Sequence, residues 1–283
     1  MVLFHSMNDV IWYTTLTVII LLAYGTGANP LRVGGRFVRE LAVSRSHLLL
    51  FAALLGILLL NKLELSFEGE MQYGADFTPL FYAIEGDLVA NIQQLLVRDW
   101  LTPVMSFMYI VVFQSLLIAS LVMYVYLDPT KRLYRATCYA IMINYVIAIP
   151  FFLYFPVNEA WFYHSNVSFP ILETFPAFES EYRHLSGLDN CFPSLHTSIS
   201  VTLAILAFRS KIRRWAWLVG ISAAVIITSI FYLGIHWMTD MLGGTVLGIF
   251  SAALGLYFSR YDLPAGRTFP VPGSMRELTN KRR

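Results

Sequence analysis

Seven long apolar runs dominate the 283-residue sequence and limit what the chain can fold into. We place them near residues 10–28, 46–61, 101–127, 136–156, 194–208, 215–234 and 241–259. A helix that crosses a bilayer needs about 20 mostly apolar residues, and inside the bilayer the backbone N–H and C=O groups must be hydrogen-bonded within the protein. With 57% hydrophobic and 13% charged residues, the sequence predicts an all-α, polytopic membrane helical bundle of about seven transmembrane helices.

Basic residues predict which side of the membrane each loop occupies. All but Lys62, Arg98 and Arg183 of the 20 Lys and Arg residues fall in the first, third and fifth loops or in the tail after the seventh run. Because loops rich in Lys and Arg stay in the cytoplasm, we expect the N-terminus outside or in a lumen and the C-terminus in the cytoplasm. The membrane is then the plasma membrane of a prokaryote or an organelle membrane of a eukaryote.

Two long loops lie on the expected outer side. The first covers residues 62–100, and its apolar residues fall at helical spacing on one face: Ile84, Leu88, Ile92, Leu95 and Leu96. This pattern predicts a helix that lies on the outer leaflet. Packing on the bundle, or a lid over a lipid-access gap, are the alternatives. The second loop, residues 157–193, is rich in aromatic and acidic residues.

Two histidines fall at the expected outer ends of the last three runs. Ser194 and His196 open the fifth run, where a helix start offers unpaired N–H groups and the positive end of a dipole to an anion. His236 and Asp240, before the seventh run, are four residues apart, so on a helix the carboxylate can orient the imidazole. One histidine can then attack phosphorus while the other protonates the leaving oxygen. The alternative for each histidine is an anchoring or packing role.

The segments around these histidines resemble two signature motifs. PSLH at Pro193–His196 and GIHWMTD at Gly234–Asp240 are similar to the second and third motifs of the type 2 phosphatidic acid phosphatase superfamily. The resemblance implies a core of six transmembrane helices and a metal-independent phosphatase or phosphotransferase without a cofactor, because members of this superfamily have those properties and many act on membrane lipids.

The resemblance also implies roles for individual residues. His236 is expected to be the nucleophile that forms a phosphohistidine, with Asp240 as its orienting partner. His196 is expected to be the general acid. Ser194 and Leu195, in the second motif, are expected to bind the substrate.

The sequence departs from the superfamily pattern at three places. The first motif, Lys-x6-Arg-Pro, has no counterpart after Lys62 or Lys131. Leu195 replaces a usual glycine, and Ile230 stands where an arginine normally follows the serine of the third motif. The Pro-Ser-Leu-His form resembles the branch that contains inositol phosphorylceramide synthase, whose members move a phosphoinositol group from one lipid to another. We therefore expect a divergent, phosphotransferase-like member.

Few cations remain on the outer side to bind a phosphate. Arg183, in the second outer loop, is our first candidate for a clamp on the phosphate. The alternative is a surface charge that offsets Glu179 and Glu181.

Three segments and one function follow from these features. Residues 1–45 are expected to hold an extra N-terminal transmembrane helix and a basic cytoplasmic loop, residues 46–259 a phosphatidic acid phosphatase-like catalytic membrane domain, and residues 260–283 a basic cytoplasmic tail. The expected enzyme acts at the outer or lumenal membrane face. Its expected partners are a phosphorylated lipid substrate and membrane lipids, without nucleic acid, and a homo-oligomer stays open.

Other features bear on competing functions. A transporter is expected to carry ionisable residues along a path at the membrane midplane, whereas the runs hold only Gln114, Asn144 and scattered Ser and Thr. A transporter and a lipid-binding receptor remain the alternatives.

The two cysteines, Cys138 and Cys191, lie at opposite ends of the spans, so we expect no disulfide and no structural metal site.

Overall fold

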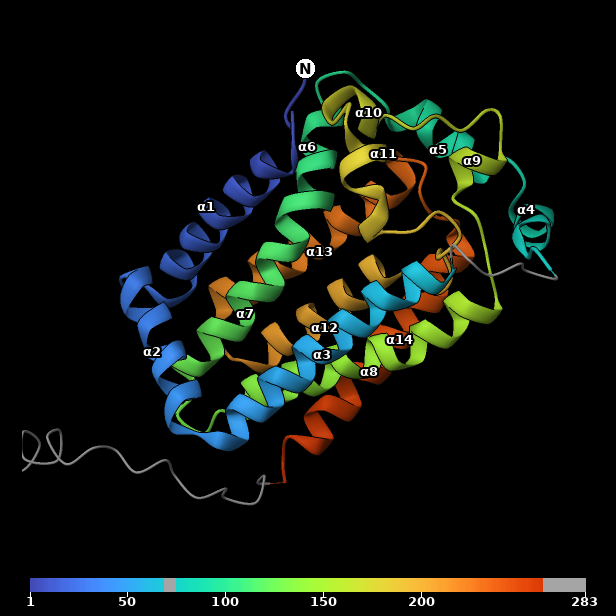
Figure 1. Ribbon diagram of the computed structural model, residues 1–283. Helices are drawn as coiled ribbons and strands as arrows, with labels where there is room; N and C mark the ends of the chain where they lie inside the picture. The colour runs from blue at the N-terminus through green and yellow to red at the C-terminus, as the bar shows by residue number, and fades with distance from the viewer. Residues whose placement is uncertain (69–74, 262–283) are drawn as a thin grey trace, which may run out of the picture.

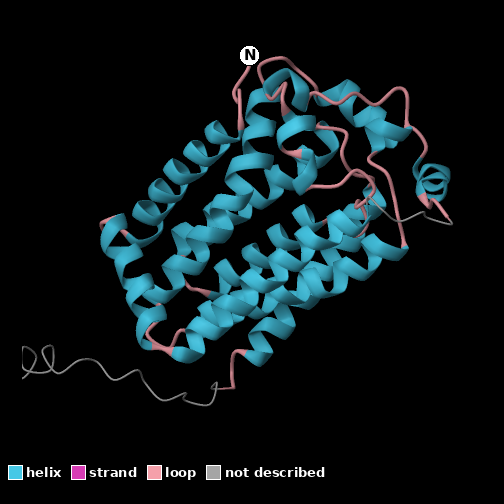
Figure 2. Cartoon of the chain, in the orientation of Figure 1, coloured by secondary structure: helices cyan, strands magenta, loops and turns pink. Residues whose placement is uncertain are grey.

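The computed structural model of the protein describes residues 1–68 and 75–261. Over those residues the elements are helices joined by loops, without a strand (Figure 2). The predicted all-α bundle is therefore confirmed. The longest single helices are α1 (Met7–Thr26), α3 (Arg45–Glu68), α8 (Arg132–Tyr154), α13 (Arg213–Tyr232) and α14 (Met238–Phe258).

A further long helix contains an irregular turn. It is built from α6 (Thr102–Phe107), the π-helical turn η1 (Met108–Val112) and α7 (Phe113–Leu127). Single π turns inside α-helices are often found at functional sites because they change the direction of the side chains around them. Here the turn carries Tyr109, which is buried.

Six helices in the described part of the chain are long and apolar enough to cross a membrane. They correspond to six of the seven predicted spans. The run predicted at 194–208 forms α12 (Leu195–Arg209), which has 15 residues and a length of about 22 Å at 1.5 Å per residue. This helix packs against α8, α13 and α14, inside the bundle (Figure 1). Its surroundings are therefore mostly protein, and it is shorter than a full span.

Small residues bring α12 and α14 close together. A Cβ added at Gly244 would lie 2.5 Å from the carbonyl oxygen of Ser194, and one added at Gly248 would collide with the carbonyl of Ser198. The hydroxyl of Thr202 donates to the carbonyl of Gly248 at 3.0 Å. The close contact fixes the first turn of α12 beside the first turn of α14.

Two segments differ from the structure expected for them in the helices that they contain. The first basic loop contains the amphipathic helix α2 (Pro30–Val43), which Asn29 caps. The expected single helix around residues 84–96 is instead split at Gly86 into α4 (Thr78–Glu85) and α5 (Leu88–Leu96). The alternative, in which the predicted face packs on the bundle, differs from the structure, because α5 buries Val89, Ala90 and Gln93. That the predicted face lies on the outer leaflet stays a prediction.

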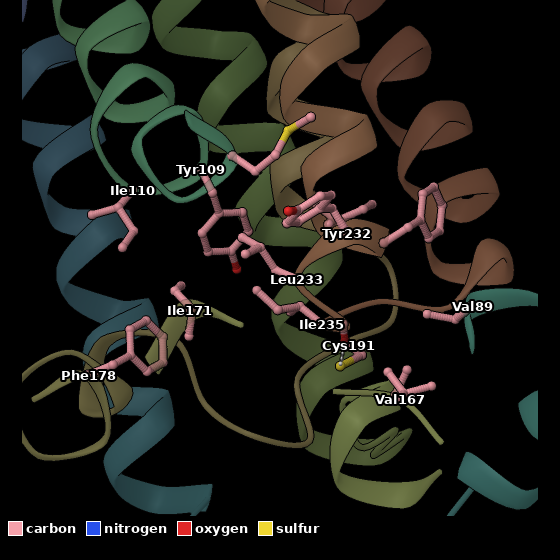
Figure 3. Close-up of a cluster of buried hydrophobic side chains, with 14 of the residues drawn as sticks. Val89, Tyr109, Ile110, Val167, Ile171, Phe178, Cys191, Tyr232, Leu233 and Ile235 are labelled. Atoms are coloured by element: carbon pink, nitrogen blue, oxygen red, sulfur yellow. Dashed lines mark hydrogen bonds between the residues drawn. The ribbon is translucent and has the colours of Figure 1, made fainter. Parts of the chain in front are cut away.

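The loop of residues 157–193 covers the end of the bundle at which α12 and α14 begin. It contains α9 (Ala160–Tyr163), α10 (Ile171–Thr174), α11 (Phe178–Glu181) and the 3-10 turn η2 (Arg183–Leu185). A cluster of buried apolar side chains joins this loop to α5, η1 and the end of α13 (Figure 3). Figure 1 shows α5, α9, α10 and α11 at the same end as the N-terminus, and α2 at the opposite end.

Candidate active site

The two predicted histidines lie close together at the covered end of the bundle. His196 is in the first turn of α12, and His236 is in the short connection between α13 and α14. Their ring centroids are 6.4 Å apart. Both side chains line a cavity of about 370 Å³, so a small group held between the rings can contact both histidines.

His236 and Asp240 form a buried pair. The Nδ1 atom of His236 lies 3.3 Å from Oδ2 of Asp240, and the backbone N–H of Trp237 donates to the same oxygen at 2.8 Å. The structure thus places the carboxylate beside the ring, as the spacing of four predicts. A hydrogen bond from Nδ1–H leaves the lone pair on Nε2, the nitrogen available for attack.

The first turn of α12 is held by Ser194. Its hydroxyl accepts from the N–H of Thr197 at 3.3 Å, and its N–H donates to the carbonyl of Asp240 at 3.2 Å. Ser194 is fully buried and is not among the cavity-lining residues, whereas Leu195 is. The structure therefore gives the Ser194 hydroxyl a capping role, and its expected contact with the substrate stays a prediction. Pro193 precedes the cap.

Aromatic rings fix the position of His196. Its ring stacks on Tyr109, with centroids 4.0 Å apart and planes at 17°, and lies 4.3 Å from the ring centroid of Phe113. Tyr109 and Phe113 also line the cavity. No local pattern indicates a role for either residue, because both lie inside a long apolar run.

Arg183 is bound by glutamates instead of facing the cavity. Its Nη1 lies 2.7 Å from Oε1 of Glu159, and its Nη2 lies 2.8 Å from Oε1 of Glu179. Nη1 also donates to the carbonyl of Gly187 at 2.8 Å. The expected phosphate clamp is thus engaged within the protein. The ion pair with Glu179 agrees with the alternative of an offsetting charge, while Glu181 accepts from the N–H of Met7.

Glu159 brings a carboxylate to the cavity, and no pattern in the sequence had indicated this residue. It lines the cavity and is 4% exposed. Burial raises the pKa of its carboxyl group, and the guanidinium of Arg183 opposes that rise. The indole N–H of Trp161 also donates to Glu159. The cavity therefore holds a carboxylate whose charge is offset by an arginine behind it.

A second carboxylate occupies the start of α14. The Oε2 and Oε1 atoms of Glu85 accept from the backbone N–H groups of Met238 and Thr239 at 2.7 and 2.6 Å. The unpaired N–H groups that a helix start offers to an anion are here satisfied from α4. Of the two helix starts at the site, the start of α12 is thus the one left for a substrate anion.

The walls of the cavity differ in character. Apolar side chains come from α3 and α7, among them Leu58, Leu65, Leu117 and Ile118. Polar side chains also line the cavity, among them Asn61 of α3, Gln114 of α7, Glu159 and the two histidines. Among the residues that the structure describes, no Lys or Arg lines this cavity. Without such a cation, an anion there depends on histidines, other polar side chains and backbone N–H groups.

Comparisons with known proteins agree with the motifs. Residues 81–254 match the model of the PAP2 superfamily. A stretch of 62 residues is 45% identical to the protein named "Putative undecaprenyl-diphosphatase YbjG" of Escherichia coli (strain K12). That stretch is 22% of this chain and 31% of the relative, so the match spans less than a third of the relative's length. No solved structure matches the chain.

The family match includes His196, His236 and Asp240, together with the helices that hold them. It also includes Tyr109, Glu159 and Glu85, which reach the site from segments far apart in the sequence. Since it covers more than half of a chain that has six membrane-length apolar helices, the chain is an integral membrane protein that belongs to the PAP2 superfamily.

Proposed function

We propose that the protein is a phosphatase or phosphotransferase that acts on a phosphorylated lipid through His236. The observation that carries this proposal is the buried His236–Asp240 pair, which faces His196 across a cavity. A nucleophile, an orienting carboxylate and a second proton-transfer group are the parts that covalent phosphoryl transfer requires.

The proposed reaction has two steps. Nε2 of His236 attacks phosphorus, the bond from phosphorus to the leaving oxygen breaks, and His196 gives that oxygen a proton. Asp240 stabilises the imidazolium that forms. In the second step water or a lipid hydroxyl attacks phosphorus, the P–N bond breaks, and His196 takes the proton of the attacking hydroxyl. Water gives hydrolysis, and a lipid hydroxyl gives transfer.

The charge of the site favours a phosphodiester. With no Lys or Arg on the cavity wall among the described residues, the backbone N–H groups at the start of α12 and the two histidines hold the phosphoryl oxygens. A phosphodiester carries one negative charge and a phosphomonoester carries about two. This difference supports the phosphotransferase-like branch suggested by Leu195, in which one lipid donates a phosphodiester-linked group to another.

The apolar wall supports a lipid substrate. Leu58 and Leu65 of α3 and Leu117 and Ile118 of α7 line the cavity, and Ile118 is 41% exposed on the outside of the bundle. A hydrocarbon chain can lie along these residues while its head group reaches the histidines.

Hydrolysis of a lipid diphosphate is the second candidate. The relative from Escherichia coli is named for that activity, and the similarity is high over the 62 aligned residues. The two candidate reactions need nearly the same site, because they differ in the acceptor of the second step. The acceptor is water in hydrolysis and a lipid hydroxyl in transfer.

The proposed membrane face is the outer or lumenal one. The cavity lies at the start of α12 and α14, whereas Arg132, Arg209, Lys211 and Arg260 gather around a second hollow near the other ends of these helices. The basic end is expected in the cytoplasm, which leaves the histidines on the opposite face.

The test compares lipid phosphates and phosphodiesters as substrates of the detergent-purified protein, with EDTA present and with or without a lipid that offers a free hydroxyl. The variants are His236→Ala and, as a matched control, His184→Ala, because His184 is exposed and does not line the cavity. We expect turnover that survives EDTA, persists in His184→Ala and disappears in His236→Ala. Equal turnover by His236→Ala and wild type contradicts the proposal.

A further inference from the structure

Cys191 lies beside the histidine–aspartate pair and has no role in the proposed reaction. Its Sγ, a ring nitrogen of His236 and a carboxylate oxygen of Asp240 all lie within 4.8 Å of one another. All three residues are buried. Cys191 and His236 also line the cavity, which gives a small ion a route to them.

The contacts of the sulfur within the protein are weak. The Sγ of Cys191 lies 3.6 Å from the carbonyl of Ile235 and 4.0 Å from the carbonyl of Leu188. Figure 3 marks the contact with Ile235 by a dashed line. The thiol is free, and the other cysteine of the chain, Cys138, is in α8. Packing therefore leaves the sulfur available as a ligand.

Asp240 supplies an independent sign of a missing partner. Its Oδ2 is hydrogen-bonded, but its Oδ1 is buried and accepts from no group in the described part of the chain. A buried carboxylate oxygen without a donor is unfavourable, because it has lost its hydration without replacement. A cation at this oxygen would satisfy it.

The three donors have the chemistry and charge of a zinc-type site. Thiolate, imidazole and carboxylate are the ligands of Zn²⁺ in proteins. A thiolate and a carboxylate together balance the charge of a divalent ion. At ordinary zinc–ligand distances the donor atoms of a tetrahedral site are about 3.3 to 3.6 Å apart. If the donor atoms are at the upper limit of 4.8 Å from one another, they need to move closer together by about one ångström to bind such an ion.

We propose that Cys191, His236 and Asp240 form a binding site for a thiophilic divalent metal ion of the zinc class, and that the ion inhibits the enzyme. The metal forms bonds to sulfur, nitrogen and oxygen, the thiol proton is released, and the fourth position faces the cavity. The inhibitory effect rests on the proposed function, because the metal takes His236 and Asp240 out of the reacting pair. The binding itself does not depend on that function.

Neighbouring charges favour a cation at this place. The carboxylates of Asp240 and Glu159, which are both buried, attract a divalent ion.

The first experiment titrates Co²⁺, a spectroscopic substitute for Zn²⁺, into the full chain purified without a polyhistidine tag. The variants are Cys191→Ser and Cys191→Ala, with Cys138→Ser as the matched control. We expect one Co²⁺ per chain and a thiolate-to-cobalt charge-transfer band in wild type and in Cys138→Ser. The band should be absent from both Cys191 variants and should disappear when Zn²⁺ is added. A wild type without the band, or a band that survives in the Cys191 variants, overturns the site.

The second experiment measures turnover at increasing Zn²⁺ without chelator. We expect the half-inhibiting Zn²⁺ concentration to be at least about tenfold higher in Cys191→Ser than in wild type or Cys138→Ser, and EDTA to restore activity. Equal inhibition of all three proteins overturns the inhibitory role. If the wild type turns over none of the lipids, the proposed function fails, while the cobalt titration still decides whether the metal site exists.

Discussion

Tyr109 lies flat against His196, with ring centroids 4.0 Å apart and an angle of 17° between the planes. The tyrosine comes from the π turn of the helix that runs from Thr102 to Leu127, and the histidine comes from the first turn of α12. A stacked ring restricts the imidazole to one orientation, and proton transfer depends on that orientation. Tyr109 is therefore a positioning residue for the second histidine.

Replacement of Tyr109 tests this relationship. We expect Tyr109→Ala to lower kcat by about 10-fold to 100-fold with a smaller change in KM, because a proton donor displaced by about an ångström loses that much. Tyr109→Phe retains the ring and should stay close to wild type. Steady-state kinetics with one lipid substrate measures both variants. Equal loss in the two variants would assign the effect to the hydroxyl group.

Glu85 connects α4 to the helix that carries Asp240. Because its carboxylate accepts from Met238 and Thr239, Glu85→Ala should destabilise the first turn of α14 by about 1 kcal/mol and lower kcat more than it changes KM. Glu85→Gln keeps one acceptor oxygen and should lie between Ala and wild type. The control is Glu173→Ala, since Glu173 is exposed. An unchanged kcat in Glu85→Ala contradicts this role.

Arg183 and Glu159 are expected to act as a structural pair. Their side chains are 14% and 6% exposed, and removal of one partner from a buried pair costs about 3–5 kcal/mol because the other charge stays unpaired. We predict that Arg183→Ala lowers the thermal unfolding midpoint strongly and that Arg183→Ala with Glu159→Gln recovers part of the loss. A stable Arg183→Ala variant with a raised KM would instead support the phosphate clamp.

The same pair gives a pH dependence. Burial raises the pKa of Glu159 above its ordinary value of 4.5, so between the ordinary and the raised value the folded protein binds more protons than the unfolded chain. The contribution of Glu159 to stability therefore falls as the pH rises through that window. The guanidinium of Arg183 opposes the rise in the pKa of Glu159. Without it the pKa rises further, and the window extends to higher pH. Thermal unfolding of wild type and Arg183→Ala across a pH series should show this extension, and identical pH profiles would contradict it.

Close packing of α12 and α14 makes Gly244 sensitive to substitution. A Cβ there meets the carbonyl of Ser194 at 2.5 Å, so Gly244→Ala should push the two helix starts apart and cost about 1–3 kcal/mol. Gly56→Ala is the matched control, because no atom lies within 4 Å of a Cβ added at Gly56. The midpoint of thermal unfolding and kcat should both fall in Gly244→Ala and stay unchanged in Gly56→Ala. Equal stability of the two variants would show that α14 adjusts freely.

Local patterns were enough to predict the bundle and the central pair. The apolar runs indicate most of the helices, and the spacing of four between His236 and Asp240 predicts their contact. Glu159, Glu85 and Tyr109 could not be predicted, because each reaches the site through contacts between distant segments that leave no local pattern. Arg183 was interpreted from its charge alone, and the buried glutamate that binds it became visible only in three dimensions.

The short helices show the same limit. The apolar spacing from Ile84 to Leu96 is compatible with one helix, but Gly86 adopts a positive φ of 54° and separates α4 from α5. On α5, the amide of Gln93 hydrogen-bonds the carbonyls of Ser168 and Tyr232. A polar residue therefore packs inward on α5, because its partners lie on other segments.

Direct detection of the covalent intermediate tests the central claim best. The protein is mixed briefly with a lipid labelled at phosphorus, quenched in alkali and digested, and the labelled residue is identified by mass spectrometry. We expect label on His236, less label in Asp240→Asn because the ring loses its ionised partner, and none in His236→Ala. Turnover without label on His236, or label on another residue in the wild type, contradicts this claim.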